Sequence, residues 1–343
     1  MKKTPRILIS INETTQKGVD WLCQTFPDAE VRVGPFIYDV DDKMPADLMR
    51  GVDVYFCELP PRNFEDFDQL KWMQLTSAGY GQVYGLPIIE RGIRVTNGTG
   101  NFDVVIAEWN ILMMLTWQRN MPGMLANQKN CLYQRREDFQ LQFRGSTIGF
   151  FGYGGIGRET ARIAKAMGVT VWGMAPNGKA RPRPDIYCIR GVGDPKGVLP
   201  DRMFSPDQFE EFMPHLDYLV IAAALTETSK DIIGAKELNL LKPSAVVINS
   251  ARAAIIQEQP LIQCLREGRI RGASIDALYN EPLPPESPWW SMDNTIITSH
   301  IAGDDLTTRF TEGIFGLFGE NLKRYIAGKT LLNELTTEQL QGN

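Results

Sequence analysis

Three polar residues whose side chains can carry out acid–base chemistry follow three apolar segments late in the chain. Arg252, Glu281 and His300 come after the segments 245–249, 273–277 and 295–298, which have the length and flanks of short strands. If these segments are strands of an open α/β sheet, ligands bind beyond their carboxyl ends, where the three side chains would meet. A guanidinium can hold a carboxylate in bidentate fashion and polarise a neighbouring carbonyl, and an imidazole exchanges protons near neutral pH. The three types together predict hydride chemistry on a 2-oxo or 2-hydroxy acid, with Arg252 on the substrate, His300 as acid and base, and Glu281 orienting His300.

Each of these residues also has an ordinary structural alternative. Arg252 alone would be a surface ion-pair partner, and Glu281, directly before Pro282, a loop residue. Coincidence of all three at successive strand ends favours the catalytic interpretation. The other histidine, His215, lies before the segment 218–223, at the opposite end of the predicted sheet, and we interpret it as structural.

A glycine-rich turn earlier in the chain has the spacing of a dinucleotide-binding loop. Residues 152–157 read Gly152-Tyr153-Gly154-Gly155-Ile156-Gly157, a GxGxxG pattern between a predicted strand (147–151) and a helical segment. Glycines at the first, third and sixth positions, Gly152, Gly154 and Gly157, let the backbone turn tightly and approach a diphosphate. The helix N-terminus adds N–H donors and a partial positive charge. The alternative is a glycine-rich turn without a ligand, but the flanking strand and helix favour a nicotinamide cofactor.

The residues after the next predicted strand bear on the choice of cofactor. NAD-specific sites place an acid at that strand end, where its carboxylate accepts the ribose hydroxyls, but this chain has Ala175. Asn177, Lys179, Arg181 and Arg183 follow, and cations there could pair with the 2′-phosphate of NADP. The pattern favours NADP over NAD, with a solvated basic loop as the open alternative.

Strand-like and helix-like segments alternate along the whole chain, which predicts parallel sheets covered by helices. The expected strands are 6–11, 29–33, 52–57, 71–75 and 93–96, then 147–151, 169–174, 218–223, 245–249, 273–277 and 295–298. Helices are expected at 102–119 and 306–326, the second returning to the first domain, and a short strand near Ile186 in the Gly/Pro-rich segment 176–206. A length of 343 residues exceeds what one core accommodates. We therefore expect a substrate domain (1–101 and 304–343) into which a dinucleotide-binding Rossmann domain (102–303) is inserted.

Composition excludes several other classes of protein. A net charge of -5 gives no general attraction to nucleic acid or to anionic membranes. Five dispersed cysteines without a CxxC pair, and only 2 histidines, make a metal site unexpected and suit reduced thiols. No apolar run reaches the roughly 18 residues that a membrane span needs. We expect a cytoplasmic protein with a small-molecule substrate.

The motifs together resemble the D-isomer-specific 2-hydroxyacid dehydrogenase family over nearly the whole chain. Segments 249–276, 281–284 and 298–303 resemble its arginine, glutamate and histidine signatures, and Ser77-Ala78-Gly79 resembles the loop whose backbone N–H groups face the substrate carboxylate. The resemblance implies a flavodoxin-like substrate domain, a D-2-hydroxy acid and a homodimer. It also implies cofactor contacts at Gly155, Ile156, Ala224, Ala251 and Asp276, with Asp276 at the nicotinamide.

Five positions depart from the family pattern, and most of them bear on the cofactor. Ala175 and Gln257 replace acids, Ala224 and Ser299 replace prolines, and Ala253 replaces a glycine. Glu281 stands where formate dehydrogenases have glutamine, and the loop from Thr76 to Gly79 lacks the lysine of phosphite dehydrogenases. A carboxylate substrate is therefore expected, as in glyoxylate or hydroxypyruvate reductases. The alternative from another class is a nucleotide-sensing, corepressor-like regulatory protein, which we rank lower because the chain has no Pro- or Ser-rich tail.

Overall fold

The computed structural model describes residues 5–11, 16–305 and 308–342, which form two compact units. Unit 1 comprises Met1–Phe102, Pro184–Ile189 and Asp305–Asn343, and unit 2 comprises Asp103–Arg183 and Arg190–Asp304. Two of the junctions lie one residue beyond the boundaries expected from the sequence. The segment Pro184–Ile189, which the sequence assigned to the dinucleotide-binding domain, belongs instead to unit 1.

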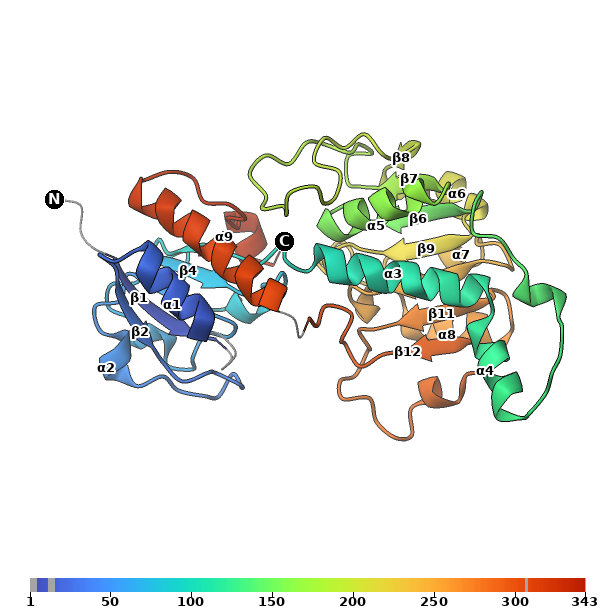
Figure 1. The fold of residues 1–343 in the computed structure, drawn as a ribbon, viewed down its shortest axis with the longest axis horizontal. Helices are drawn as coiled ribbons and strands as arrows, with labels where there is room; N and C mark the ends of the chain where they lie inside the picture. The colour runs from blue at the N-terminus through green and yellow to red at the C-terminus, as the bar shows by residue number, and fades with distance from the viewer. Residues whose placement is uncertain (1–4, 12–15, 306–307, 343) are drawn as a thin grey trace. The chain divides into compact units, whose positions relative to one another are not determined.

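Unit 1 is built on a five-stranded parallel sheet (Figure 1). Its strands are β1 (Arg6–Ser10), β2 (Glu30–Val33), β3 (Val54–Cys57), β4 (Trp72–Leu75) and β5 (Arg94–Thr96). Its helices are α1 (Gln16–Thr25), α2 (Ala46–Met49), α9 (Thr308–Ile326) and α10 (Thr337–Leu340). The strand order β2-β1-β3-β4-β5 is the flavodoxin-like order that was predicted. Residues 306–307, at the expected start of the last long helix, lie outside the described residues.

Both faces of this sheet are covered because successive strand residues point to opposite sides. Ile7 and Ile9 pack with α1 and α9, which lie side by side in Figure 1, whereas Leu8 packs in a second cluster on the other face. Phe318 of α9 stacks on Phe56 with ring centroids 4.3 Å apart, so the C-terminal helix is part of this core.

Unit 2 contains a seven-stranded parallel sheet. Its strands are β6 (Thr147–Phe151), β7 (Thr170–Met174), β8 (Arg202–Phe204), β9 (Tyr218–Ile221), β10 (Val246–Asn249), β11 (Gly272–Ile275) and β12 (Thr295–Ile297). The order β12-β11-β10-β9-β6-β7-β8 is doubly wound: successive strands are added on one side from β6 to β8 and on the other side from β9 to β12, so the strand order reverses between β6 and β9. In such sheets the switch point, at the carboxyl ends of the strands, is where a dinucleotide binds.

Helices cover both faces of the second sheet as well. On one face lie α3 (Asp103–Gln118) and α5 (Gly155–Ala166), which pack along each other and on Ile148 and Phe150 of β6. The other helices of unit 2 are α4 (Met121–Lys129), α6 (Phe209–Phe212), α7 (Ala235–Leu238) and α8 (Glu258–Arg266). Leu238 of α7 and Leu261 of α8 pack on the opposite face. Two doubly wound parallel-sheet units are thus the fold that the sequence predicts.

The Gly/Pro-rich segment after β7 was predicted incorrectly in one respect. No strand forms near Ile186 within the described chain; the short strand of this segment is β8, at the edge of the sheet. Residues near Ile186 bond within unit 1 instead: Asn333 N donates to Asp185 O at 3.0 Å, and Tyr187 N donates to Asn333 Oδ1 at 2.9 Å. The backbone conformation of this segment is therefore determined by hydrogen bonds to the distant residue Asn333, and local β-propensity could not predict those bonds.

Among the residues that the structure describes, no helix has the length and apolar character needed to cross a membrane.

Candidate active site

The glycine-rich turn after β6 has the backbone geometry of a phosphate-binding loop. Gly152 has φ 92°, a left-handed conformation, and a Cβ added there would lie 2.5 Å from the backbone N of Ala223. Gly154 is the N-cap of α5, so the first N–H groups of that helix point out of the turn. Only glycine therefore fits this close approach of two backbone segments, and the N–H groups at the start of α5 fit a dinucleotide diphosphate.

The other predicted cofactor residues follow neighbouring strands at the same edge of the sheet. Ala224, after β9, is exposed, and its carbonyl accepts a hydrogen bond from Ser229 Oγ at 2.8 Å. Ala251, after β10, is buried, and its N–H donates to Asn249 Oδ1 at 3.1 Å. Ile156 is half-buried in the first turn of α5. Because β9, β6 and β10 are parallel neighbours, the structure brings these residues to one edge of unit 2.

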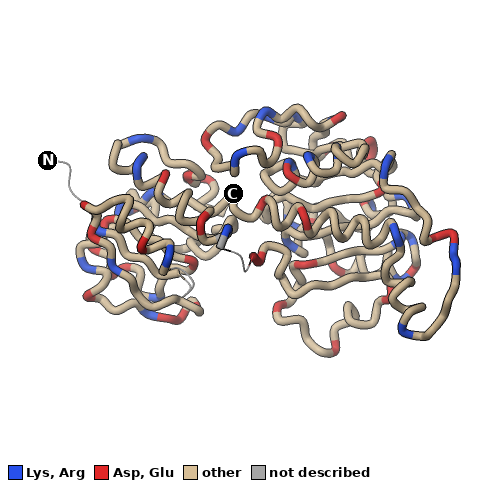
Figure 2. Tube along the Cα trace, in the orientation of Figure 1, with Lys and Arg blue, Asp and Glu red and all other residues tan. Residues whose placement is uncertain are grey.

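The basic residues predicted to read the cofactor ribose lie in the loop between β7 and β8, where Figure 2 shows several Lys and Arg positions. Asn177, Lys179 and Arg181 are all exposed. Ala175 directly follows β7, and its N–H donates to Phe204 O at 3.0 Å, so no acid stands at this strand end.

A buried arginine that the sequence analysis did not single out fastens this loop to the glycine-rich turn. Arg158 of α5 is 5% exposed and donates to Tyr153 O at 3.1 Å, to Arg181 O at 2.7 Å and to Asp194 O. Tyr153 Oη in turn donates to Asp194 Oδ2 at 3.0 Å. Arg158 directly follows the GxGxxG pattern, so its position was visible in the sequence, but two of its partners, Arg181 and Asp194, lie far along the chain.

Arg252 is held in a turn directly after β10. Asn249, the last residue of that strand, donates from Nδ2 to Arg252 O at 3.0 Å. The Arg252 side chain is exposed, and its Nη1 donates to Ala251 O at 2.7 Å. The guanidinium therefore starts beside the predicted cofactor residue Ala251 and has further N–H groups for a substrate.

Glu281 and His300 are in direct contact. His300 Nδ1 and Glu281 Oε2 lie 2.9 Å apart, and Leu278 N donates to Glu281 Oε1 at 2.7 Å. Burial raises the pKa of Glu281, but hydrogen bonds from His300 and Leu278 N and the charges of His300 and Arg252 outweigh it, so the pKa lies below its usual value. Glu281 is therefore a carboxylate that contacts the imidazole at Nδ1 and leaves Nε2 on the other side of the ring. The three residues predicted to act together are brought together within unit 2.

Asp276 holds the loop that carries His300. Its carboxylate accepts from Thr298 Oγ1 at 2.6 Å, Ile301 N at 2.9 Å and Ala302 N at 3.0 Å, and its carbonyl accepts from His300 N at 2.9 Å. His300 itself has φ 57°, a left-handed conformation uncommon outside glycine. The sequence suggested a cofactor contact for Asp276, and the geometry adds a second role, the positioning of the histidine loop.

The predicted substrate loop lies in unit 1, directly after β4. Ser77 Oγ donates to Gly79 O at 2.8 Å, and Asn97 Nδ2 donates to Ala78 O at 2.7 Å. Gln82 Nε2 donates to Ser77 Oγ at 2.8 Å. These bonds fix the carbonyls of the loop within unit 1 and so define where its N–H groups can point.

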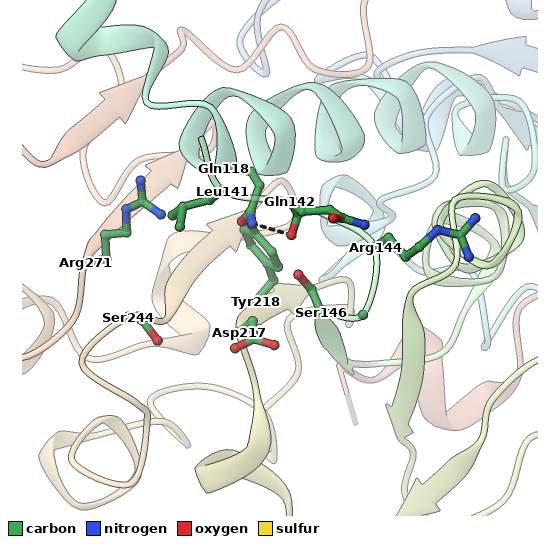
Figure 3. Close-up of a pocket in the computed structure, with 10 residues that line it drawn as sticks. Gln118, Leu141, Gln142, Arg144, Ser146, Asp217, Tyr218, Ser244 and Arg271 are labelled. Carbon is green, nitrogen blue, oxygen red and sulfur yellow. Dashed lines mark hydrogen bonds between the residues drawn. The ribbon is translucent and has the colours of Figure 1, made fainter. Parts of the chain in front are cut away.

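One hollow in unit 2 lies away from these residues, at the amino ends of the strands (Figure 3). It has a volume of about 320 Å³ and is lined by Ser146, Asp217, Ser244 and Arg271, which lie one or two residues before β6, β9, β10 and β11. Ligands of open α/β sheets bind at the opposite, carboxyl ends. We therefore assign it no role. His215 also lies at this end, its ring 5.2 Å from that of Trp172.

Comparison with known proteins gives the family. The chain is 28% identical over 269 residues to the D-3-phosphoglycerate dehydrogenase of Methanocaldococcus jannaschii, a match of 78% of this chain that spans about half (48%) of that protein. It is 27% identical over 344 residues to the glyoxylate reductase of Thermococcus gammatolerans, with 96% of each chain covered.

A solved structure shares the whole fold. The NADPH-dependent glyoxylate/hydroxypyruvate reductase of Sinorhizobium meliloti, in complex with NADP and sulfate, superposes with a TM-score of 0.77 at 22% identity, covering 99% of this chain and 100% of that one. Residues 111–302, more than half of the chain, match the model of the NAD-binding domain of the D-isomer specific 2-hydroxyacid dehydrogenases. The chain belongs to the D-isomer specific 2-hydroxyacid dehydrogenase family.

Proposed function

We propose that the protein is an NAD(P)-dependent oxidoreductase that interconverts a small 2-oxo acid and the corresponding D-2-hydroxy acid, in the manner of glyoxylate and hydroxypyruvate reductases. The observation that carries this proposal is the 2.9 Å contact between His300 Nδ1 and Glu281 Oε2 at the carboxyl edge of a dinucleotide-binding sheet. Arg252, whose charge acts on Glu281, supplies the cation that a carboxylate substrate needs.

Three side chains, those of Arg252, Glu281 and His300, have separate roles in the proposed reaction. The bound nicotinamide supplies or accepts the hydride at the substrate C2. Arg252 binds the substrate carboxylate and polarises the adjoining carbonyl. His300 Nε2 donates a proton to the carbonyl oxygen during reduction and takes it back from the hydroxyl during oxidation. Glu281 holds the imidazole through Nδ1 and fixes its orientation. The loop Ser77-Ala78-Gly79 of unit 1 is proposed to offer its backbone N–H groups to a carboxylate.

A panel of 2-oxo acids tests the proposed function. Purified protein should oxidise NADPH or NADH when given glyoxylate, hydroxypyruvate or a bulkier 2-oxo acid, as followed by the loss of absorbance of the reduced cofactor. Neither the family model nor the relatives named above support the regulatory alternative. If the protein binds cofactor but shows no turnover with any of the acids and either cofactor, the regulatory alternative is favoured instead.

We propose NADP as the preferred cofactor, because Ala175 leaves the β7 end without an acid and exposed Lys179 and Arg181 follow it. Replacing Lys179 and Arg181 together by alanine should raise the KM for NADPH by at least about tenfold, since each charge-assisted hydrogen bond to a phosphate contributes about 1.5–3 kcal/mol. The KM for NADH should change little. The measurement is kcat/KM for both cofactors with one acid.

The matched control changes two exposed cations of unit 2 outside this loop, Lys236 and Arg266, to alanine. Equal losses for NADPH and NADH in the loop variant would show that the loop does not read the 2′-phosphate.

We also propose a homodimer, in which α4 and the segment after it contact a second copy. Each described residue of α4 is exposed or half-buried, and Leu125 and Leu132 are 57% and 56% exposed and Tyr133 fully so. In Figure 1 this helix and the segment after it extend out from the rest of unit 2. Apolar side chains gathered on such a projection are typical of an interface.

Changing Leu125 and Tyr133 to glutamate should convert the dimer into a monomer, because two buried, unpaired charges would be placed in each half of the interface. Light scattering after size-exclusion chromatography gives the mass. The control, Val198→Glu, introduces one such charge at a 71% exposed valine in another loop of unit 2. A wild-type protein that elutes as a monomer at micromolar concentration contradicts the proposal.

A further inference from the structure

A buried carboxylate lies against the glycine-rich turn, at a place that the proposed chemistry does not use. Asp103, the first residue of α3, is 6% exposed. A Cβ added at Gly155 would overlap its Oδ2 and lie 2.5 Å from its Cγ. Gly155 is the first residue of α5, so the Asp103 carboxylate sits beside the helix N-terminus that faces a diphosphate in this fold.

Charged groups on two sides influence Asp103. Burial raises its pKa to about 6, the charge of Arg183 opposes this rise, and the charge of Glu159 adds to it. Arg183 is part of the loop that Arg158 fastens down, and its Nη1 would lie 3.8 Å from a Cβ added at Gly154. Glu159, on α5, is itself bonded to Arg162 and to Gly193 N, so its charge is largely compensated.

The ordinary role of an aspartate at this position accounts for only part of the arrangement. An acid in the first turn of α3 interacts favourably with the dipole of its own helix, which an exposed side chain would do equally well. Asp103 is instead buried, with its carboxylate directed at a second helix N-terminus that belongs to the proposed cofactor site. A negative charge at this place opposes a dianionic diphosphate, whereas a neutral carboxyl group could donate a hydrogen bond to it.

We propose that Asp103 is a proton-linked positioning residue of the cofactor site: binding of the dinucleotide diphosphate at the turn requires Asp103 to take up a proton. This inference rests on the proposed function, because it assumes that the turn binds a dinucleotide. The negative charge of the bound diphosphate favours the protonated form of the Asp103 carboxyl group. Binding therefore takes up a proton, and by linkage the affinity for the cofactor falls as the pH rises.

The experiment measures the Kd of NADH between pH 6 and pH 9 by fluorescence titration for wild type and Asp103→Asn. NADH is the probe because the 2′-phosphate of NADPH itself titrates near pH 6. In wild type the Kd should rise by about tenfold or more between pH 6 and pH 8, since each pH unit above the pKa of the free carboxyl costs up to a factor of ten. In Asp103→Asn this rise should be absent and NADH should bind more tightly than to wild type at pH 8.

Calorimetry in two buffers of different ionisation enthalpy counts the protons directly. Wild type should take up more protons per NADH at pH 7.5 than Asp103→Asn, with the difference approaching one. All other titratable groups are the same in the two proteins, so the difference reports Asp103 alone. Asp293→Asn, which removes an exposed carboxylate near the amino end of β12, is the matched control and should behave as wild type.

Parallel pH profiles of Kd for wild type and Asp103→Asn, or a profile that is flat in wild type, would overturn the proposal while leaving the cofactor assignment intact. Failure of wild type to bind either NADH or NADPH at any pH would sink the proposed function along with it. If Asp103→Asn does not fold, Asp103→Ser keeps a polar side chain that can cap α3 without the charge, and the same comparison decides.

Discussion

Replacing His300 by asparagine is expected to lower kcat by about 10³-fold, within the range that general acid–base catalysis contributes. Asparagine can occupy the left-handed backbone conformation of this position, φ 57°, and can still bond to Glu281, but it cannot deliver a proton. The Kd for NADPH should stay close to that of wild type because His300 acts only on the substrate. Steady-state kinetics and a cofactor titration together provide the measurement.

The second histidine supplies the control for this variant. His215→Asn changes an exposed side chain at the amino end of the sheet and should leave kcat within about twofold, as surface substitutions usually do. Because the pKa of Glu281 lies below its usual value, its carboxylate stays charged at pH 5 and above, and it should add no acid-side loss of activity in that range. Turnover in His300→Asn equal to wild type would remove this residue from the mechanism.

Changing Arg252 to lysine is expected to reduce kcat/KM for the 2-oxo acid by about 10²-fold or more although the charge is kept. A lysine offers a point charge on a flexible chain, whereas the guanidinium fork binds a carboxylate through two parallel hydrogen bonds and reaches the adjoining carbonyl. Loss of a bond made to both substrate and transition state raises KM, and loss of carbonyl polarisation lowers kcat, so both should change.

The exposed cation Arg266, in the last turn of α8, gives the comparison for Arg252→Lys. Arg266→Lys should leave kcat and KM for the 2-oxo acid unchanged. An Arg252→Lys protein whose KM for the acid is unchanged, with cofactor affinity intact, would mean that another group holds the substrate carboxylate.

Both sheets could be predicted because the signals that define them are local. Buried runs such as Ile7-Leu8-Ile9 and Val246-Val247-Ile248 are continuous β-branched or apolar segments bounded by turns, and the strand Thr147–Phe151 was predicted with its observed ends. The candidate site was predictable for the same reason. Arg252, Glu281 and His300 follow strands, and parallel strands bring their carboxyl ends to one edge whatever the length of the connections.

Contacts between distant segments could not be predicted in this way. Nothing in the residues around Asp103 indicates that its carboxylate meets Gly155, or that Arg158 ties Asp194 and Arg181 to the glycine-rich turn. Such pairs depend on how a long loop folds back, which periodicity does not encode. The strand wrongly expected near Ile186 has the same origin, since Asn333 determines the backbone there.

The membership of Pro184–Ile189 in unit 1 restricts how the two units can be exchanged between relatives. A chimera that replaces the single stretch 103–304 with the equivalent stretch of another family member would import a foreign segment into unit 1 and remove the bonding partners of Asn333. Recombination of this chain should therefore keep residues 184–189 native and graft unit 2 as two pieces. Each unit has its own sheet and core, but neither unit is formed by a single continuous segment of the chain.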